Sequence, residues 1–124
     1  MVDVVCGVIK NEDKYLIAQR GDEKNYGKWE FPGGKVKENE HPFDSIKREI
    51  REELNIEILP DREIIKYKFK GFNLIFIMCK IIQNEKLIKL DGHIDYKWIE
   101  INGFKSYEFI EGDVKFINYL EKNY

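Results

Sequence analysis

Three glutamates in this sequence could do chemistry together: Glu49, Glu52 and Glu53. Residues three and four apart are neighbours on one surface of a helix, so the three carboxylates would face the same side. Alone they would repel one another, by roughly a few tenths of a kcal/mol per exposed pair. A divalent cation would reverse that sign, and oxygen ligands suit Mg²⁺ or Mn²⁺ rather than zinc. An acidic helix face is also often only a solvated face, so the spacing alone leaves both interpretations open.

The helix that would carry these carboxylates is predicted from Pro42 to about Leu54. Its apolar residues follow helical spacing and would form one buried stripe: Phe43, Ile46, Ile50 and Leu54. Pro42 suits a first helical position, whereas His41 is a poorer N-cap than Ser or Thr. A predicted Pro-Gly-Gly turn at 32–34 would bring backbone carbonyl and amide groups close to this helix.

The other predicted elements are strands and one closing helix. The strands are predicted at 2–10, 14–20, 28–36, 62–71, 73–82 and 94–101, and the closing helix includes 114–120. The order of strands, helix, strands and helix predicts a mixed sheet with helices on both sides. We therefore expect an α/β or α+β sandwich, with one domain over residues 1–124.

Composition narrows the function classes. The chain has 124 residues with an apolar share of 43%, which fits one folded domain and argues against disorder. Its 21 Lys and Arg nearly balance its 23 Asp and Glu, so no overall charge attracts a nucleic acid polymer, although a few cations could hold a small anionic substrate. No signal peptide or membrane span is apparent, which favours a cytoplasmic protein without membrane contact.

The two cysteines, Cys6 and Cys79, both lie in apolar runs that are typical of strands. Their spacing matches no metal-binding pattern. Two buried free thiols are the favoured interpretation.

Residues 34–56 resemble the Nudix box, G-x5-E-x7-R-E-U-x-E-E-x-G-U, in which U is a bulky aliphatic residue. The matching residues are Gly34, Glu40, Arg48, Glu49, Ile50, Glu52, Glu53 and Ile56. Only Asn55 departs from the pattern, at the final glycine. Because Asn is the next-best residue for the left-handed conformation that ends a helix, we expect the helix to end correctly there.

The resemblance to the Nudix family implies a metal site and roles for the box residues. The implied ligands of Mg²⁺, or of Mn²⁺ in its place, are the Gly33 carbonyl, Glu49, Glu52 and Glu53. Arg48 would orient the glutamates through charge-assisted hydrogen bonds, and Glu40 would hold the loop against the helix. Glu49 and Glu53 are both candidates for the base that takes a proton from the attacking water.

The segment "WEFPGGK" at 29–35 is similar to the MutT-type branch of the family, the enzymes of the nucleotide pool. That likeness implies hydrolysis of a nucleoside triphosphate to a nucleoside monophosphate and pyrophosphate. The implied substrate is 8-oxo-dGTP or a cytidine-type triphosphate. Arg20 and Lys35 would hold its phosphates.

The base pocket is predicted from three further residues. By the same likeness, Asp113 would recognise the hydrogen-bond donors on a guanine or cytosine edge, or it would simply cap the last helix. Phe31 and Phe72 could stack on the base, or they could belong to the core.

One loop departs from the family. Many relatives carry an acidic metal ligand at the position of Gly92. Asp91 or Asp95 could replace it, or the site could use fewer protein ligands. His93 could act in catalysis or bond only to backbone.

Two other functions remain open. ADP-ribose or a dinucleoside polyphosphate could be the substrate, although relatives that cleave ADP-ribose carry a downstream proline and this chain has none after Pro60. A Nudix-fold binding module without catalysis would usually lack box glutamates, and all are present here. Relatives occur as monomers and as homodimers, so both states are open.

Overall fold

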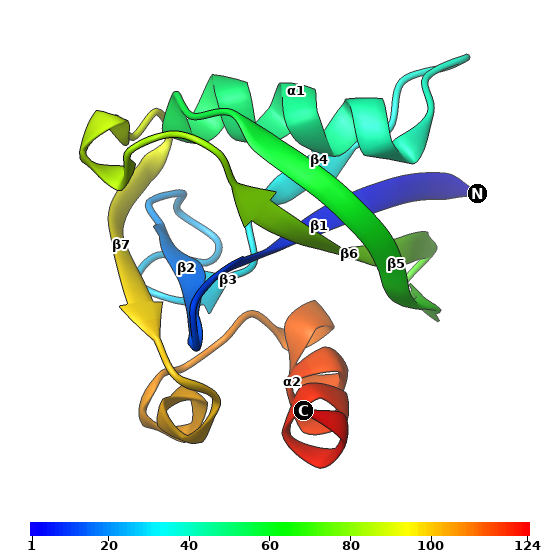
Figure 1. Cartoon of the computed structure of the whole chain (residues 1–124). Coiled ribbons are helices and arrows are strands. Elements are labelled where there is room, and N and C mark those ends of the chain that lie inside the picture. The colour runs from blue at the N-terminus through cyan, green and yellow to red at the C-terminus, as the bar shows by residue number, and fades with distance from the viewer.

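One seven-stranded sheet separates two helices in the computed structural model, which describes residues 1–124 (Figure 1). The strands are β1 (Val2–Asn11), β2 (Lys14–Arg20), β3 (Trp29–Glu30), β4 (Gly33–Lys35), β5 (Ile58–Phe69), β6 (Phe72–Ile81) and β7 (His93–Ile99). The helices are α1 (Pro42–Leu54) and α2 (Glu111–Asn123), with two short 3₁₀ helices, η1 (Glu85–Leu87) and η2 (Ile101–Ser106). Because α1 covers one face of the sheet and α2 the other, the predicted sandwich is confirmed.

The sheet is mixed. Its strand order is β3-β2-β1-β6-β5, with β1 and β6 parallel and the other pairs antiparallel. On the side away from β6, β1 changes partner along its length: Val4–Cys6 pair with β4, and Lys10–Asn11 pair with β2. The chain from 28 to 36 crosses from β2 to β1 at Pro32, so the single strand predicted there is divided into β3 and β4.

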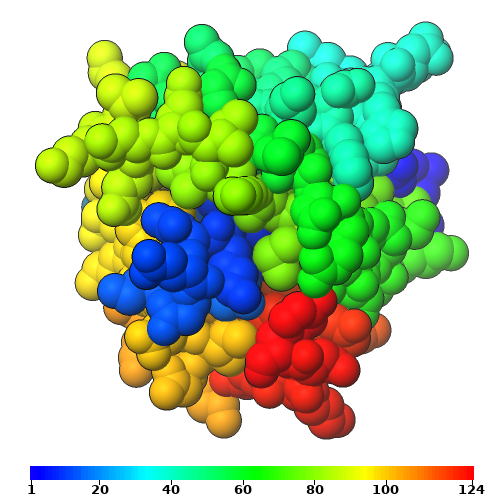
Figure 2. Space-filling view, viewed as in Figure 1, coloured from blue at the N-terminus to red at the C-terminus, as the bar shows by residue number.

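A separate core lies on each face of the sheet. Ile46, Ile50 and Leu54 of α1 are fully buried on one face, as their helical spacing predicted. Phe116, Ile117 and Leu120 of α2 are buried on the other face. Each fully buried side chain of this size contributes about 1.5–3 kcal/mol. In space-filling view, the β1–β2 hairpin (blue) reaches the surface between these layers, with α2 (red) below it (Figure 2).

The ends of α1 follow from the residues that flank it. His41 caps the start, since its Nδ1 accepts the backbone N–H of Phe43 at 3.0 Å. Asn55 ends the helix in the left-handed conformation at φ 59°, and its N–H donates to the Arg51 carbonyl at 3.1 Å. The expected left-handed residue is therefore confirmed.

The predicted Pro-Gly-Gly turn is wrong. Gly33 and Gly34 are extended in β4 and pair with Cys6 and Val5 of β1, and neither has a positive φ. They are glycines because of close approach: a Cβ on Gly33 would overlap the carbonyl group of Val5. A residue without a Cβ is required here only because β4 pairs with β1, which is distant in sequence. The local Pro-Gly-Gly sequence alone therefore gave the wrong prediction of a turn.

Strand β5 begins four residues earlier than predicted and includes Pro60. It lies at the edge of the sheet, where a residue without an N–H is tolerated, and its register shifts between Pro60 and Arg62. No helix in the structure has the length and apolar character that crossing a membrane would need.

Candidate active site

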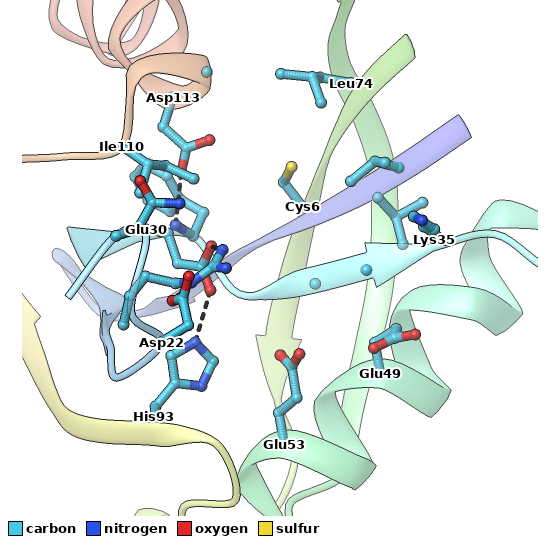
Figure 3. A pocket seen from close by; sticks show the side chains of 18 of the residues that line it. Cys6, Asp22, Glu30, Lys35, Glu49, Glu53, Leu74, His93, Ile110 and Asp113 are labelled. Carbon is cyan, nitrogen blue, oxygen red and sulfur yellow. Dashed lines mark hydrogen bonds and ion pairs between the residues drawn. The ribbon is translucent and has the colours of Figure 1, made fainter. Parts of the chain in front are cut away.

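A pocket of about 690 Å³ opens beside β4 and runs from α1 to the first turn of α2 (Figure 3). Glu49 and Glu53 of α1 point into one end, and Asp113 of α2 lies at the other, with Cys6 of β1 between them. The pocket therefore joins the two ends of the predicted site, which come from helices on opposite faces of the sheet.

Arg48 organises the first of these ends. Its Nε and Nη2 donate to the two carboxylate oxygens of Glu40, each at 2.9 Å, and its Nη1 donates to Glu49 Oε1 at 2.8 Å. Glu40 Oε1 also accepts the backbone N–H of Lys37 at 3.0 Å. Hydrogen bonds from Arg48 and then from Lys37 lower the pKa of Glu40 to about 2. Glu40 therefore ties the loop to α1, and Arg48 holds the Glu49 carboxylate beside it.

Gly34 makes room for Glu49. A Cβ on Gly34 would lie 2.5 Å from Glu49 Oε2, so any larger residue would push the carboxylate away from β4. The glycine pair thus serves two purposes: Gly33 packs backbone on backbone, and Gly34 accommodates a functional side chain.

The environment of Glu53 in the pocket strongly shifts its pKa. Burial raises its pKa to about 9, and the charges of Glu30 and Glu49 add to the rise. Its Oε1 atom is buried without a hydrogen-bond partner, so the site is suited to a donor or a cation there. Buried carboxylates that repel one another are the environment that a divalent cation stabilises.

Glu52 lies apart from the other two glutamates. Its side chain is 57% exposed, it does not line the pocket, and its Oε1 is 3.5 Å from Arg48 Nη1. No three His, Cys, Asp or Glu side chains lie close enough to hold a metal ion by themselves. This donor set still fits Mg²⁺, which is commonly held by one or two carboxylates together with waters and substrate phosphates.

Glu30 of β3 is a site residue that the sequence reasoning missed. Its side chain is 11% exposed, its Oε1 accepts Arg20 Nη1 at 2.9 Å, and its Oε2 lies 2.7 Å from His93 Nε2. The signal was available, since an acidic residue between Trp29 and Phe31 in a buried strand needs a partner. The strands β2, β3 and β7 bring these three side chains together.

Arg20 lines the pocket, but it is already paired with two carboxylates, those of Asp22 and Glu30. Burial by itself would lower its pKa, and the hydrogen bonds to Asp22 and Glu30 outweigh burial and raise it. Lys35 also lines the pocket, and its Nζ lies 6.0 Å from the ring centre of Phe72.

Asp91 and Asp95, the two candidates to replace an acidic residue at Gly92, are placed differently in the structure. Gly92 has φ +99°, a conformation that favours glycine over an acidic residue. Asp91 lines the pocket, and its N–H donates to the Glu53 carbonyl at 2.9 Å. Asp95 lies outside the pocket and accepts the N–H of Tyr96. His93 bonds to the Glu30 carboxylate rather than to backbone.

Asp113 does not cap α2, because the cap position belongs to Ile110. It is 2% exposed, and its Oδ2 accepts the backbone N–H of Phe31 at 2.9 Å. Burial, and then the charge of Glu30, raise the pKa of Asp113 well above its usual range. Its other oxygen points toward the part of the pocket lined by Cys6 and Leu74 (Figure 3).

The two candidate stacking residues are placed differently. Phe31 forms part of the pocket wall but is a core residue, 2% exposed, with its ring centre 5.2 Å from that of Phe116. Phe72 is half-buried and does not line the pocket. The apolar side chains that line the pocket also include Leu74 and Phe69, which the sequence did not single out.

The chain is similar to proteins of one known family. The NUDIX domain family model matches residues 1–120. An 8-oxo-dGTP diphosphatase of Buchnera aphidicola subsp. Schizaphis graminum (strain Sg) is 35% identical over 97% of this chain and 93% of its own. The CTP pyrophosphohydrolase of Escherichia coli (strain K12) is 45% identical over 46% of this chain and 43% of its own. The solution structure of the E. coli ORF135 protein has the same fold, with a TM-score of 0.81 and 24% identity over 98% of this chain and 89% of that one.

Proposed function

Because this chain belongs to the Nudix hydrolase family, we propose that it hydrolyses a nucleoside triphosphate to a nucleoside monophosphate and pyrophosphate. The observation that carries the proposal is that one pocket has Glu49 and Glu53 at one end and the buried Asp113 at the other. A nucleotide is complementary to such a pocket, since it has a charged polyphosphate at one end and a flat base with hydrogen-bonding edges at the other.

The residues that would hold Mg²⁺, or Mn²⁺ in its place, are Glu49, Glu53 and the Gly33 carbonyl, with Glu52 close by on α1. A bound divalent ion supplies neutralising charge for phosphate oxygens and a lower pKa for water. Arg48 keeps the Glu49 carboxylate in place, and Arg20 and Lys35 contribute positive charge along the polyphosphate.

The hydrolysis is a substitution at phosphorus. The oxygen of water forms the new P–O bond, the bridging P–O bond breaks in line with it, and its electron pair leaves with the pyrophosphate. The water proton passes to Glu49 or Glu53, the two carboxylates that point into this end of the pocket. The protein contributes mainly position and electrostatics, which is the usual division of labour in phosphoryl transfer.

For the substrate we propose 8-oxo-dGTP or a cytidine-type triphosphate. Asp113 offers one carboxylate oxygen to the pocket while the Phe31 N–H holds the other, so its orientation is fixed before a base enters. An ionised carboxyl at that place would accept the N1–H and amino group of a guanine-type base, or the amino group of cytosine, and these donors would offset the burial that raises the pKa of Asp113. The two relatives named for 8-oxo-dGTP and CTP support these two bases.

The test of the reaction is a panel of nucleotides incubated with the protein and Mg²⁺: 8-oxo-dGTP, dGTP, CTP, 5-methyl-dCTP, ADP-ribose and a diadenosine polyphosphate. We expect one triphosphate to exceed the others in kcat/KM by orders of magnitude and to release pyrophosphate. Asp113→Asn should narrow that preference by about tenfold or more, because one good base contact is worth about 1–3 kcal/mol. Preferred cleavage of ADP-ribose or the dinucleotide would overturn the substrate assignment.

The test of the metal site is thermal unfolding with and without Mg²⁺. Binding to the folded state alone raises Tm, so the wild-type protein should gain stability as Mg²⁺ is added. Glu53→Gln should lose most of that gain together with turnover. Glu63→Gln, an exposed change on β5 outside the pocket, is the matched control and should retain both. An equal increase of Tm with Mg²⁺ in the two variants would show that Glu53 does not bind the metal.

A further inference from the structure

Two buried polar atoms of residues that line this pocket have no hydrogen-bond partner, and they belong to different elements. One is Glu53 Oε1 on α1, and the other is His93 Nδ1 at the start of β7. The His93 side chain is only 5% exposed. Figure 3 shows the His93 ring and the Glu53 carboxylate pointing into the same region of the pocket.

Glu30 contacts only one of the two His93 nitrogens. One Glu30 oxygen accepts Arg20 Nη1, and the other lies 2.7 Å from His93 Nε2. A carboxylate paired with a guanidinium has no hydrogen to give, so Nε2 must be the donor. A neutral imidazole carries only one N–H, and Nδ1 therefore presents its lone pair as an acceptor.

We propose that Glu30 is a positioning residue that holds His93 in the Nε2–H tautomer, so that His93 Nδ1 and Glu53 Oε1 accept the two hydrogens of the attacking water. Accepting both hydrogens directs the lone pair of the water oxygen away from these two residues, toward the phosphorus. Positive charge at the second oxygen of Glu53 would keep this carboxyl ionised, against the burial that raises its pKa. Both acceptors act before the attack, and the water proton then passes to Glu53, one of the two bases named for the hydrolysis above, so this role rests on the proposed function.

Glu30→Gln separates this role from simple packing, because glutamine has nearly the same shape. Its amide oxygen can still accept from Arg20, but its NH₂ group then faces His93 Nε2. Nε2 must become an acceptor, and the ring hydrogen moves to Nδ1. The pocket would keep its shape while Nδ1 changes from acceptor to donor. The same logic explains why an amide in place of a carboxylate disables histidine in other enzymes.

The first experiment observes the tautomer directly, in metal-free protein, by ¹⁵N NMR of labelled imidazole at about pH 8, above the usual titration range of histidine. The chain has two histidines, and His41→Asn removes the other signal while leaving a good N-cap. We expect the Nε2–H form in the wild-type protein and the Nδ1–H form in Glu30→Gln. Asp22→Asn is the control, since it removes the other Arg20 partner without touching His93. An Nδ1–H or doubly protonated His93 in the wild-type protein would overturn the proposal.

The second experiment measures kcat and KM for the best nucleotide of the panel. Glu30→Gln and His93→Gln should each lower kcat by roughly tenfold to a hundredfold, with KM changed by less than about threefold. The double variant should lose no more than the worse single variant, because both changes disable one acceptor. A double variant whose loss of kcat equals the product of the two single losses would refute the role. An unchanged kcat in Glu30→Gln would also refute it.

Circular dichroism and thermal melting identify variants that fail to fold. If Glu30→Gln does not fold, His93→Gln carries the kinetic test, and full kcat in that variant refutes the role. If the wild-type protein cleaves none of the nucleotides, the proposed function has failed. The NMR result then still decides whether Glu30 sets the tautomer of His93.

Discussion

At the scale of single residues, the site depends on carboxylates held in different environments. Glu40 is stabilised as an anion by Arg48, whereas Glu53 is destabilised as an anion by burial and by its neighbours. Both belong to the same sequence motif, and nothing in their spacing distinguishes them. The difference arises from what the fold places around each one: a guanidinium beside Glu40, and two further carboxylates near Glu53.

Glu40 gives a prediction for acid unfolding. Because its pKa in the folded protein is lowered to about 2 from an ordinary value of 4.5, its contribution to the free energy of unfolding is present above about pH 4.5. That contribution is lost as the pH falls from there toward about 2. Glu40→Gln removes it, so the difference in stability between wild type and variant should shrink over this pH range.

Urea unfolding of both proteins at several pH values measures that difference. Glu38→Gln, an exposed change in the same loop, is the control. A difference between wild type and Glu40→Gln that stays constant down to about pH 2 would contradict the Glu40–Arg48 account.

At the scale of elements, β4 and α1 form the wall of the pocket beside Glu49 and Glu53. The two glycines of β4 predict opposite outcomes for the same substitution. Gly33→Ala forces a methyl group into the backbone of β1 and should cost about 1–3 kcal/mol of unfolding free energy. Gly34→Ala meets only the end of the Glu49 side chain, which can rotate away, so stability should change little while kcat falls.

Chemical unfolding and steady-state kinetics on the two variants separate these effects. Gly103→Ala is the control, because a Cβ there meets nothing closer than 4.0 Å. Full activity in Gly34→Ala would mean that the position of Glu49 against β4 is not required.

The elements also show how far the sequence could predict this protein. The bounds of α1 were predicted correctly, because its apolar spacing, Pro42 and Asn55 all lie within the helix or next to it. The glycines at 33 and 34 were misassigned to a turn, because their need for close approach comes from β1, which is distant in sequence. Glu30 is marked in the sequence as an acidic residue in a buried strand, but its partners could not be predicted, since they come from β2 and β7.

The whole molecule is two cores separated by a sheet, and each core supports one end of the pocket. Phe116 of α2 stacks on Phe76 of β6 with ring centres 4.2 Å apart, and Phe31, whose N–H holds Asp113, packs against both. Phe116→Ala should cost about 3–5 kcal/mol of stability and raise KM, because the base end of the pocket loosens. The increase of Tm with Mg²⁺ should persist, because α1 packs on the other face.

Ile50→Ala is the matched change on the α1 face. It should also destabilise the protein, by about 2–5 kcal/mol, but it should weaken the response to Mg²⁺. Thermal melting at a range of Mg²⁺ concentrations compares the two variants. Equal loss of the Mg²⁺ response in both would show that the two layers do not act separately.

The parallel pairing of β1 with β6 has a consequence for how the chain is made. Each residue of β1 from Val2 to Lys10 pairs with one between Phe72 and Lys80, so β1 must wait for a strand that is synthesised much later. Such distant pairings close slowly. The acidic helix α1 is synthesised during that wait, and Asp113 emerges only near the end. A nascent chain therefore carries the glutamates of the hydrolase long before it has a pocket in which they can act.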